Sequence, residues 1–408
     1  MTLLDFLLIP ALLLFLPSFL RKKRGGWAQR FGKTPPLAAS AKKRILLHGV
    51  SVGEINALRT LVPLLTPHLD VVISTTTDTG LARAQSLFSS TCTIVRFPLD
   101  ASWAVKRFLD AVKPDAVALC ELEIWPQFIR FCGERAVPVC IINGRLSERS
   151  FRGYRFFRPL LTKMFRSLEF ASVQDTDYAA RFQYMGVEPA RCHITGSMKW
   201  DAISLSGNAE LEADAVRLAS ELGINLSRPL IVAGSTGPGE EELLHQVVPP
   251  NVQLLCAPRK PERFDEAAAA LPGCVRRSQK IARPCSRFLL DSIGELRNAY
   301  ALADLVVIGR SFGRQFGSDP IEPIALGKPV VIGPAHGDFK VIVDQFAAAD
   351  AIVVATRESL RTSLERLLLS KEAREALAAN GLVCIRKNQG AAARNAELIM
   401  AMMHRHRA

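Results

Sequence analysis

The sequence predicts an α/β protein made of two successive, doubly wound halves. Short apolar runs alternate with helix-like stretches along the whole chain, and many of these runs are continuous in Val, Ile and Leu. That pattern is typical of strands buried on both faces of a parallel sheet. A polar, acidic stretch at about residues 202–228 indicates a linker between the halves. A single sheet of this many strands would exceed the usual size, so we expect two domains that face a ligand cleft at the carboxyl ends of their strands.

The predicted strands follow the apolar runs in order. In the first half they span residues 44–50, 70–77, 93–99, 116–122, 138–143 and 193–196. In the second half they span residues 230–235, 252–258, 287–291, 305–309, 330–333 and 351–355. Residues 370–407 are rich in Ala, Leu and Arg and predict two C-terminal helices. The expected domains are therefore residues 21–205 and 225–380, with residues 381–408 as a separate C-terminal helix.

The N-terminal segment predicts a membrane anchor. Residues 1–20 carry a single charged side chain, Asp5, and would span about 30 Å as a helix. They lack the basic start and small-residue cleavage site of a signal peptide. Four basic residues follow at 21–24, and then Trp27 and Phe31. Positive charge places this end of the segment in the cytoplasm, with the aromatic rings at the depth of the lipid headgroups.

Two alternatives to a straight membrane span stay open. Pro10 and Pro17 favour a helix that is kinked or lies shallowly in the bilayer. A buried core helix is the other alternative, and the dense basic flank disfavours it. We expect an anchored protein, with the question of spanning left open.

The excess positive charge of the chain is concentrated in two segments. The net charge is +13, from 52 Lys and Arg against 39 Asp and Glu. Residues 21–53 carry nine of these cations and no acid, and residues 145–166 carry seven cations against Glu148. No helix-turn-helix, zinc-finger or RNP signature supports a nucleic-acid partner. An anionic membrane surface or an anionic substrate is the better explanation of the charge.

Cysteine and histidine spacing gives no sign of a metal or a disulfide framework. The nine cysteines are scattered, and no pair has C-x-x-C spacing. Most lie in apolar runs, where a thiol behaves as a small hydrophobic group, which indicates a reduced, cytoplasmic compartment. The chain contains neither an H-E-x-x-H motif nor a G-x-x-x-x-G-K-[ST] phosphate loop. We therefore expect neither a metal ion nor a cofactor.

Two turns of the first half place carboxylates beyond predicted strands. Residues 48–54 (HGVSVGE) put small residues and Glu54 between a strand and a helix, at the mouth of the sheet. Capping of the next helix explains an acid there equally well. Glu121 and Glu123 follow another predicted strand. These paired acids could cap a helix or contact a sugar.

Four turns of the second half carry charged residues beyond predicted strands. Residues 234–241 (GSTGPGEE) suit an anion-binding turn, and residues 256–264 (CAPRKPERF) end in a cationic tip. Residues 293–296 and 317–323 each place a Glu near a helix start. Such a Glu can accept hydrogen bonds from vicinal ribose hydroxyls, although an isolated one is more often a cap.

Taken together, these turns resemble the Kdo transferase family, which moves 3-deoxy-D-manno-octulosonic acid (Kdo) from CMP-Kdo onto a lipid A precursor. The resembling blocks, in chain order, are SVGE (51–54), ELEIWP (121–126), INGRLSERS (142–150), GSMKWD (196–201), AGSTGPGEEE (233–242), APRKPERF (257–264), GELRNAYALAD (294–304), DPIEP (319–323) and GPAHGDF (333–339). The resemblance implies a GT-B fold of two Rossmann-like domains, an N-terminal membrane anchor and no required metal. It implies a role in lipopolysaccharide biosynthesis at the cytoplasmic face of the inner membrane.

The resemblance also assigns roles to positions. The catalytic base of the family matches Glu54, and its groups for transition-state stabilisation match Glu121 and Lys199. The positions that match the family's CMP site are Pro258, Arg259, Ile293, Gly294, Glu295, Asp319, Pro320, Ile321 and Glu322. The implied partners are CMP-Kdo, a lipid A precursor (lipid IVA) and an anionic membrane surface, with no nucleic acid.

The chain departs from the family pattern at several positions. Members usually have His at the positions of Gly237 and Lys260, and Asn at those of Asp319 and Asp338. They usually have Gly-Gly-Ser where this chain has Gly-Arg-Ser at residues 309–311. Asp319 in place of Asn loses an amide donor and adds negative charge near the expected cytidylate.

Two other functions remain as alternatives. One is a related GT-B transferase that uses a UDP-sugar on a lipid-linked acceptor. The other is a membrane-anchored binding protein without activity, which the retention of six ionisable site residues disfavours.

Overall fold

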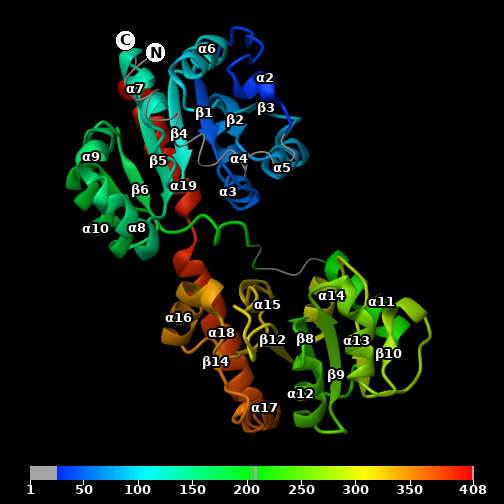
Figure 1. The fold of residues 1–408 in the computed structure, drawn as a ribbon. Coiled ribbons are helices and arrows are strands. Elements are labelled where there is room, and N and C mark those ends of the chain that lie inside the picture. Colours follow the sequence, from blue (N-terminus) through cyan, green and yellow to red (C-terminus); the bar gives the residue numbers. More distant parts are fainter. Residues whose placement is uncertain (1–24, 204, 206–208, 407–408) are drawn as a thin grey trace. The chain divides into compact units, whose positions relative to one another are not determined.

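The computed structural model describes residues 25–203, 205 and 209–406. The chain divides into two compact units (Figure 1). Unit 1 comprises the described residues up to Ala202 together with the chain from Asn388 onward, and unit 2 comprises Ile203–Lys387. The predicted anchor at residues 1–20 lies outside the described residues. Within the described ranges, no helix combines the length and the apolar character needed to cross a membrane.

Unit 1 is built on a parallel sheet of seven strands in the order β3-β2-β1-β4-β5-β6-β7. Its strands are β1 (Arg44–His48), β2 (Asp70–Thr75), β3 (Thr93–Arg96), β4 (Ala116–Cys120), β5 (Val139–Gly144), β6 (Ala171–Val173) and β7 (Cys192–Ile194). From β1 the strands are added in one direction, as β2 and β3. The chain then returns to the other side of β1, where β4 to β7 are added in the opposite direction. In a doubly wound sheet, ligands bind at such a switch point, beyond the carboxyl ends of the strands.

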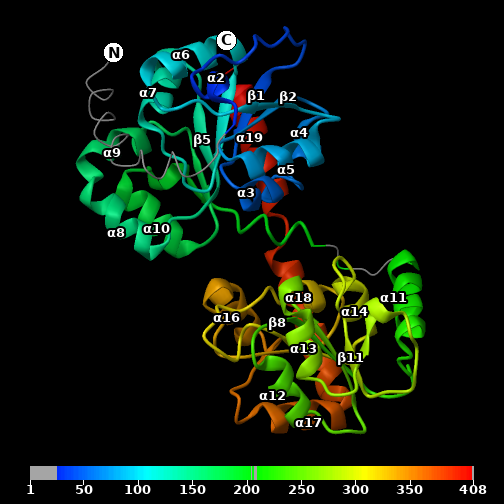
Figure 2. The same cartoon turned by 45° about the vertical axis from the view of Figure 1, so that its right-hand side comes forward.

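Helices cover both faces of the unit 1 sheet (Figure 2). One face packs against α6 (Ser102–Val112), α7 (Pro126–Glu134), α9 (Arg158–Arg166) and α10 (Thr176–Met185). The other face packs against α3 (Val52–Ala57), α4 (Val62–Leu65), α5 (Asp78–Phe88) and α19 (Ala391–Arg405). The shorter elements are α2 (Trp27–Arg30), α8 (Glu148–Phe156) and the 3-10 turn η1 (Pro189–Arg191).

Unit 2 has a second parallel sheet of seven strands, in the order β10-β11-β9-β8-β12-β13-β14. Its strands are β8 (Leu230–Thr236), β9 (Gln253–Pro258), β10 (Val275–Arg276), β11 (Arg287–Leu289), β12 (Leu305–Ile308), β13 (Val330–Ile332) and β14 (Val353–Val354). The switch point of this sheet lies between β8 and β12.

The helices of unit 2 again sandwich the sheet. One face packs against α12 (Glu240–Val247), α13 (Phe264–Ala269) and α17 (Leu360–Leu369). On the other face lie α14 (Leu296–Leu302) and α15 (Ile321–Ala325), and α11 (Ala209–Leu222) packs on α14. The remaining elements are η2 (Pro261–Arg263), η3 (Arg277–Gln279), η4 (Gly337–Phe339), α16 (Lys340–Ala348) and α18 (Lys371–Asn388).

Every predicted strand is present, and the two predicted C-terminal helices are α18 and α19. The sequence did not predict the short strands β6 and β10. The stretch at about residues 202–228, predicted to be a linker, contains α11, whose Leu218 and Leu222 are fully buried, so α11 belongs to unit 2.

The C-terminal boundary also differs from the expected domains. Residues 381–406, the part of the predicted C-terminal helix that the structure describes, do not form a separate element, because the boundary between the units falls at the end of α18. The following helix, α19, drawn in red in Figure 1, runs alongside the sheet of unit 1. Its Ile399 and Met402 are fully buried in the core of that unit. The last helix therefore completes the first domain.

Candidate active site

Glu54 lies at the start of α3, just beyond the carboxyl end of β1. Its side chain is only 8% exposed. Ser51 Oγ donates a hydrogen bond to Oε1 over 2.7 Å, and the backbone N–H of Val50 donates to Oε2 over 2.7 Å. Ser51 Oγ also accepts a bond from the Glu54 N–H, which caps the helix. The cap of α3 is thus the Ser51 hydroxyl, with Glu54 as the acid of the first turn, and the bonds from Ser51 and Val50 hold the carboxylate in one orientation at the edge of the sheet.

Glu121 follows β4, the neighbour of β1 in the sheet. Its backbone has a φ of +62°, in the left-handed region that a non-glycine residue rarely adopts. Burial, and then the negative charge of Glu54, raise the pKa of Glu121, while Lys199 and Arg145 act to lower it. The four side chains therefore lie in one electrostatic environment at this edge of unit 1.

Glu123 adds a third carboxyl group to the same edge. Trp125 Nε1 donates a hydrogen bond to its Oε2 over 2.9 Å. Burial, and then the charge of Glu54, raise the pKa of Glu123 to about 8, against the effect of the Trp125 bond. At neutral pH this group is mainly a neutral acid, so it does not repel the other two carboxylates.

Lys199 is exposed and lies on the loop after β7. The buried side chain of Asn143 accepts a hydrogen bond, over 3.0 Å, from the N–H of the residue before Lys199. Asp201 accepts bonds from the N–H groups of Gly390 and Ala392, at the start of α19. The loop is therefore held on one side by the sheet and on the other by the C-terminal helix.

In unit 2, three predicted donor-site residues share one environment around Tyr300. Arg259 comes directly after Pro258, the last residue of β9, while Asp319 and Glu322 flank the start of α15. Burial, and then the charges of Glu322 and Asp319, raise the pKa of the Tyr300 hydroxyl, and Arg259 acts against them.

Glu322 faces charges of both signs. Arg297 pairs with its Oε1 over 3.5 Å. Burial raises the pKa of Glu322, Arg297 lowers it, and Asp319 adds to the increase. Asp319 Oδ1 also accepts a hydrogen bond from the N–H of Ile321 over 2.9 Å, around Pro320 at the start of α15. The aspartate at position 319 therefore adds negative charge beside Glu322.

Glu295 is held by a different partner. Arg277 donates hydrogen bonds to both carboxylate oxygens over 3.0 to 3.2 Å, and Ser292 donates another. Burial acts to raise the pKa of Glu295, but the bonds from Arg277 and Ser292 hold it below its ordinary value. The residues before it, Ile293 and Gly294, are exposed, and Gly294 has a φ of +95°. Glu295 is thus ion-paired with Arg277, apart from the group around Tyr300.

The turn after β8 does not offer a free anion site. The buried carboxylate of Glu240 accepts hydrogen bonds from the N–H groups of Gly237 and Arg310 at Oε2, over 2.8 and 2.6 Å. Its Oε1 accepts bonds from the N–H groups of Ser311 and Phe312, over 2.8 and 2.9 Å. A side chain of the protein itself therefore occupies the anion-binding turn predicted at residues 234–241. This carboxylate ties together the two loops at the switch point of unit 2.

Gly237 is packed closely against a side chain of the following loop. A Cβ added at this position would lie 2.3 Å from Gln315 Oε1. The histidine that is usual in the resembling family would therefore require Gln315 to move. In this chain the glutamine occupies the space beside Gly237.

Comparison with known proteins now decides the family. A family model described as 3-deoxy-D-manno-octulosonic-acid transferase (kdotransferase) matches residues 25–202. The 3-deoxy-D-manno-octulosonic acid transferase of Haemophilus influenzae is 31% identical over 398 residues, covering 93% of this chain and 92% of that protein. The enzyme of the same name from Bordetella pertussis is 30% identical and covers 91% of each chain. The chain belongs to the Kdo transferase family.

Solved structures place this Kdo transferase family member in the GT-B fold class. Anabaena HepE in complex with UDP matches with a TM-score of 0.59 at 13% identity, over 88% of this chain and 99% of that chain. A glycosyltransferase from Rickettsia africae matches with a TM-score of 0.59 at 12% identity, over 89% and 99% of the two chains. At such identities the likeness shows the fold alone. The curated relatives establish the family member as a glycosyltransferase.

The structure brings together some predicted site residues of this glycosyltransferase and separates others. Glu54, Glu121 and Lys199 lie within electrostatic range of one another in unit 1, and the charges of Arg259, Asp319 and Glu322 act on Tyr300 in unit 2. Arg145, Arg297, Tyr300 and Glu240 are not among the site residues predicted from the sequence. Among the residues that the structure describes, no group of three or more His, Cys, Asp and Glu side chains is arranged to hold a metal ion.

Proposed function

We propose that this glycosyltransferase transfers Kdo from CMP-Kdo to a lipid A precursor (lipid IVA), without a metal ion, at the cytoplasmic face of the inner membrane. The observation that carries the proposal is that Glu54 and Glu121 follow the neighbouring strands β1 and β4 at the switch point of unit 1, with the charge of Lys199 acting on Glu121. The curated relatives from Haemophilus influenzae and Bordetella pertussis are named as Kdo transferases, which supports the same reaction.

Glu54 is the proposed general base. A sugar hydroxyl is too weak an acid to attack unaided, so a carboxylate must take its proton as the bond forms. Ser51 and Val50 each donate one hydrogen bond to the Glu54 carboxylate. Each carboxylate oxygen has a second lone pair, which leaves it able to accept a proton from an acceptor hydroxyl.

Glu121 and Lys199 are the proposed groups for transition-state stabilisation. As the bond between Kdo and CMP breaks, positive charge develops at the anomeric carbon and negative charge on the departing phosphate. A carboxylate stabilises the first charge, and an ammonium group stabilises the second. Lys199 also favours the ionised form of Glu121, because its charge acts to lower the pKa of that carboxyl.

Unit 2 is the proposed donor-binding unit. CMP carries one phosphate rather than a pyrophosphate, so a single arginine and backbone donors suffice to bind it. The exposed Arg259 supplies such a cation at the carboxyl end of β9. Glu322 at the start of α15 supplies an acceptor for ribose hydroxyls, and Arg297 restrains it.

A basic and apolar surface on unit 1 supports the proposed membrane location. Phe156 is 80% exposed, Phe157 53% and Leu160 67%, at the junction of α8 and α9. The exposed cations of the same two helices are Arg149, Arg152, Arg155, Arg158, Lys163 and Arg166. We call these nine residues the α8–α9 surface. Exposed apolar side chains and cations on the same helices are typical of proteins that bind the interface of an anionic bilayer.

The segment that follows the predicted anchor presents a second aromatic group. Trp27 contacts Phe31 with ring centroids 5.8 Å apart, and Phe31 contacts Trp103 at 5.5 Å. All three rings are partly exposed, and the Arg107 guanidinium lies 5.7 Å from the centre of the Trp103 ring. Aromatic rings beside cations suit the headgroup region of a membrane. This group supports the proposed anchor at residues 1–20.

The transfer reaction is tested directly with purified full-length protein in lipid vesicles. We expect transfer of labelled Kdo from CMP-Kdo to lipid IVA, with release of CMP and without added metal, measured by thin-layer chromatography of the lipid product. Labelled UDP-sugars serve as the comparison donors. Transfer from a UDP-sugar with no turnover of CMP-Kdo would contradict the proposed donor.

Membrane binding should depend on residues 1–20 in a way that salt reveals. Protein lacking this segment should bind anionic vesicles at low salt and largely release near 1 M salt. Its attraction is electrostatic, and the Debye length falls from about 10 Å at 0.1 M to about 3 Å at 1 M. Full-length protein should stay bound at both salt concentrations, since burial of apolar side chains is not screened. Vesicle co-sedimentation across a salt series measures both forms, and release of the full-length protein would argue against an anchor.

The same assay tests the α8–α9 surface in the truncated protein. Phe156→Ser combined with Leu160→Ser should reduce vesicle binding at low salt, because the apolar part of the surface is lost. Leu226→Ser is the matched control, since Leu226 is an exposed leucine of unit 2. Equal binding by the two variants would remove this surface from the proposal.

A further inference from the structure

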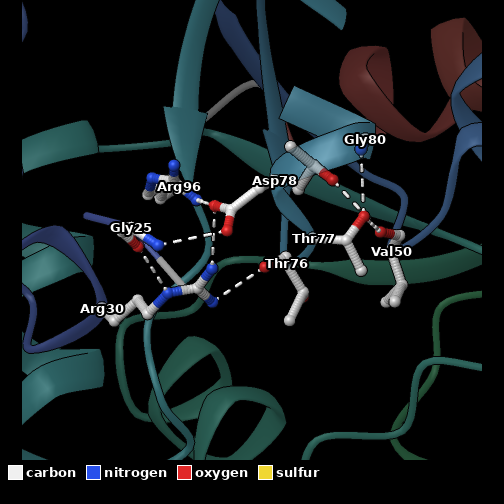
Figure 3. Close-up of polar contacts among 9 residues, drawn as sticks. Gly25, Arg30, Val50, Thr76, Thr77, Asp78, Gly80 and Arg96 are labelled. Atoms are coloured by element: carbon white, nitrogen blue, oxygen red, sulfur yellow. Dashed lines mark hydrogen bonds and ion pairs between the residues drawn. The ribbon is translucent and has the colours of Figure 1, made fainter. Parts of the chain in front are cut away.

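The backbone of Val50 links the carboxylate of Glu54 to a different loop. The Val50 N–H donates to Glu54 Oε2 over 2.7 Å. The Val50 carbonyl oxygen accepts hydrogen bonds from Thr77 Oγ1 over 2.8 Å and from Thr75 Oγ1 over 3.2 Å. Figure 3 shows the Thr77 hydroxyl pointing at this carbonyl. The loop after β2 therefore holds the residue that orients the proposed base.

The direction of the bond from Thr77 follows from its other partner. Thr77 is the N-cap of α5, and its Oγ1 accepts a hydrogen bond from the Gly80 N–H over 3.0 Å. The hydroxyl proton is then available for the Val50 carbonyl, which is purely an acceptor. Thr77 thus does two things at once: it caps a helix and fixes the backbone at Val50.

Gly80 leaves the space in which these hydroxyl groups meet the carbonyl. A Cβ at this position would lie 2.5 Å from Thr75 Oγ1, 2.7 Å from Thr77 Oγ1 and 3.1 Å from the Val50 oxygen. Any larger residue would push the two hydroxyls away from Val50. The absence of a side chain at position 80 is therefore part of the same arrangement.

An ion-pair group holds the loop after β2 from its other side. Arg30 is 2% exposed, and its guanidinium donates to the carbonyl oxygens of Gly25 and Thr76 over 3.1 and 2.8 Å. Asp78 pairs with Arg30 and with Arg96 and also accepts a bond from the Gly25 N–H, as Figure 3 shows. The loop that carries Thr77 is therefore fixed between α2 and Val50.

We propose that Thr77 is a positioning residue for Glu54, acting through the backbone of Val50. The inference rests on the proposed role of Glu54 as the base. Val50 is half-buried and lies between Gly49 and Ser51 in the turn after β1, and its N–H orients the Glu54 carboxylate. The Thr77 hydroxyl makes the shortest bond to the Val50 carbonyl, over 2.8 Å, and is assisted by Thr75 Oγ1 over 3.2 Å and by the Thr77 N–H over 3.4 Å.

The first test compares variants at Thr77 and Thr75 in full-length protein with vesicles, CMP-Kdo and lipid IVA. Thr77→Val keeps the shape and removes the hydroxyl, and turnover should fall by about 10- to 100-fold, because a displacement of about 1 Å at the reacting groups has effects of this size. Thr77→Ser keeps the hydroxyl and should restore most of the activity. Thr75→Val removes a donor that caps no helix, and should lower turnover less than Thr77→Val, since its bond to Val50 is longer.

The second test separates positioning from helix capping. In a Glu54→Gln background, Thr77→Val should cause less than a twofold further loss, because the base on which it acts is absent. An equal loss from Thr77→Val in both backgrounds would overturn the inference while leaving Glu54 as the base. Near-normal turnover of Glu54→Gln itself would instead overturn the assignment of the base. CMP affinity, measured by calorimetry, should be the same in all variants.

Discussion

Glu54→Gln should lower the turnover of Kdo transfer by about two to four orders of magnitude, the usual contribution of general base catalysis. Glutamine keeps the size of the side chain, but its amide cannot take a proton from the attacking hydroxyl. The local structure should survive, because the amide oxygen can still accept from Val50 and the amide nitrogen can donate to Ser51 Oγ. The loss should therefore reflect the missing base alone.

Three measurements separate this outcome from a general defect. Initial rates with CMP-Kdo and lipid IVA give the turnover, calorimetry gives the CMP affinity, and thermal unfolding gives the stability. CMP affinity and melting temperature should match the wild type. Glu134→Gln is the matched control, because this exposed glutamate pairs only with Arg130 at the surface among its described contacts. Near-normal turnover in Glu54→Gln would end the assignment.

The sequence predicted the edge of the unit 1 sheet because the relevant signals are local. An apolar run followed by small residues and an acid predicts a strand, a turn and a helix start, and β1 with Glu54 has that form. Glu121 follows β4 in the same way. Since parallel strands end at one edge, two such turns meet when their strands are neighbours.

The parts that the sequence did not predict depend on contacts between distant segments. β6 has three residues and is buried between β5 and β7, so its burial comes from the sheet rather than from its own pattern. The amphipathic pattern of α19 indicates that one face of the helix is buried. The pattern does not indicate which of the two units this face packs against. The occupied turn after β8 depends on Glu240 and on N–H groups of residues 310–312, about seventy positions further along the chain.

The loop that carries Lys199 is a further case of this kind. The GSMKWD block at residues 196–201 is visible in the sequence, but its anchoring by Asn143 and by the start of α19 depends on the fold. Asp201 reaches backbone groups almost two hundred positions away along the chain. A fixed loop suits the proposed role of Lys199, which is to stabilise the charge that develops on the departing phosphate. A preorganised group needs little reorganisation during the reaction.

Lys199→Met should lower turnover by about 10²- to 10³-fold, the effect of removing one preorganised group that stabilises developing charge. Methionine keeps most of the length of the side chain and removes its charge. The backbone anchors of the loop at Asn143 and Asp201 do not involve the ammonium group, so the fold should be unaffected. Lys113→Met, at an exposed lysine of the same unit, is the matched control.

The dependence of the Lys199→Met rate on pH shows how Lys199 acts. Lys199 acts to lower the pKa of Glu121, so its loss should raise that pKa further above the ordinary value of a glutamate. If Lys199 served only to keep Glu121 ionised, higher pH would deprotonate Glu121 and restore the activity of the variant. We expect no such recovery between pH 7 and pH 9, because the ammonium group also stabilises the departing phosphate directly. Full recovery at high pH would show that Lys199 acts only by keeping Glu121 ionised. Turnover equal to that of the wild type at every pH would show that Lys199 has no role in the mechanism.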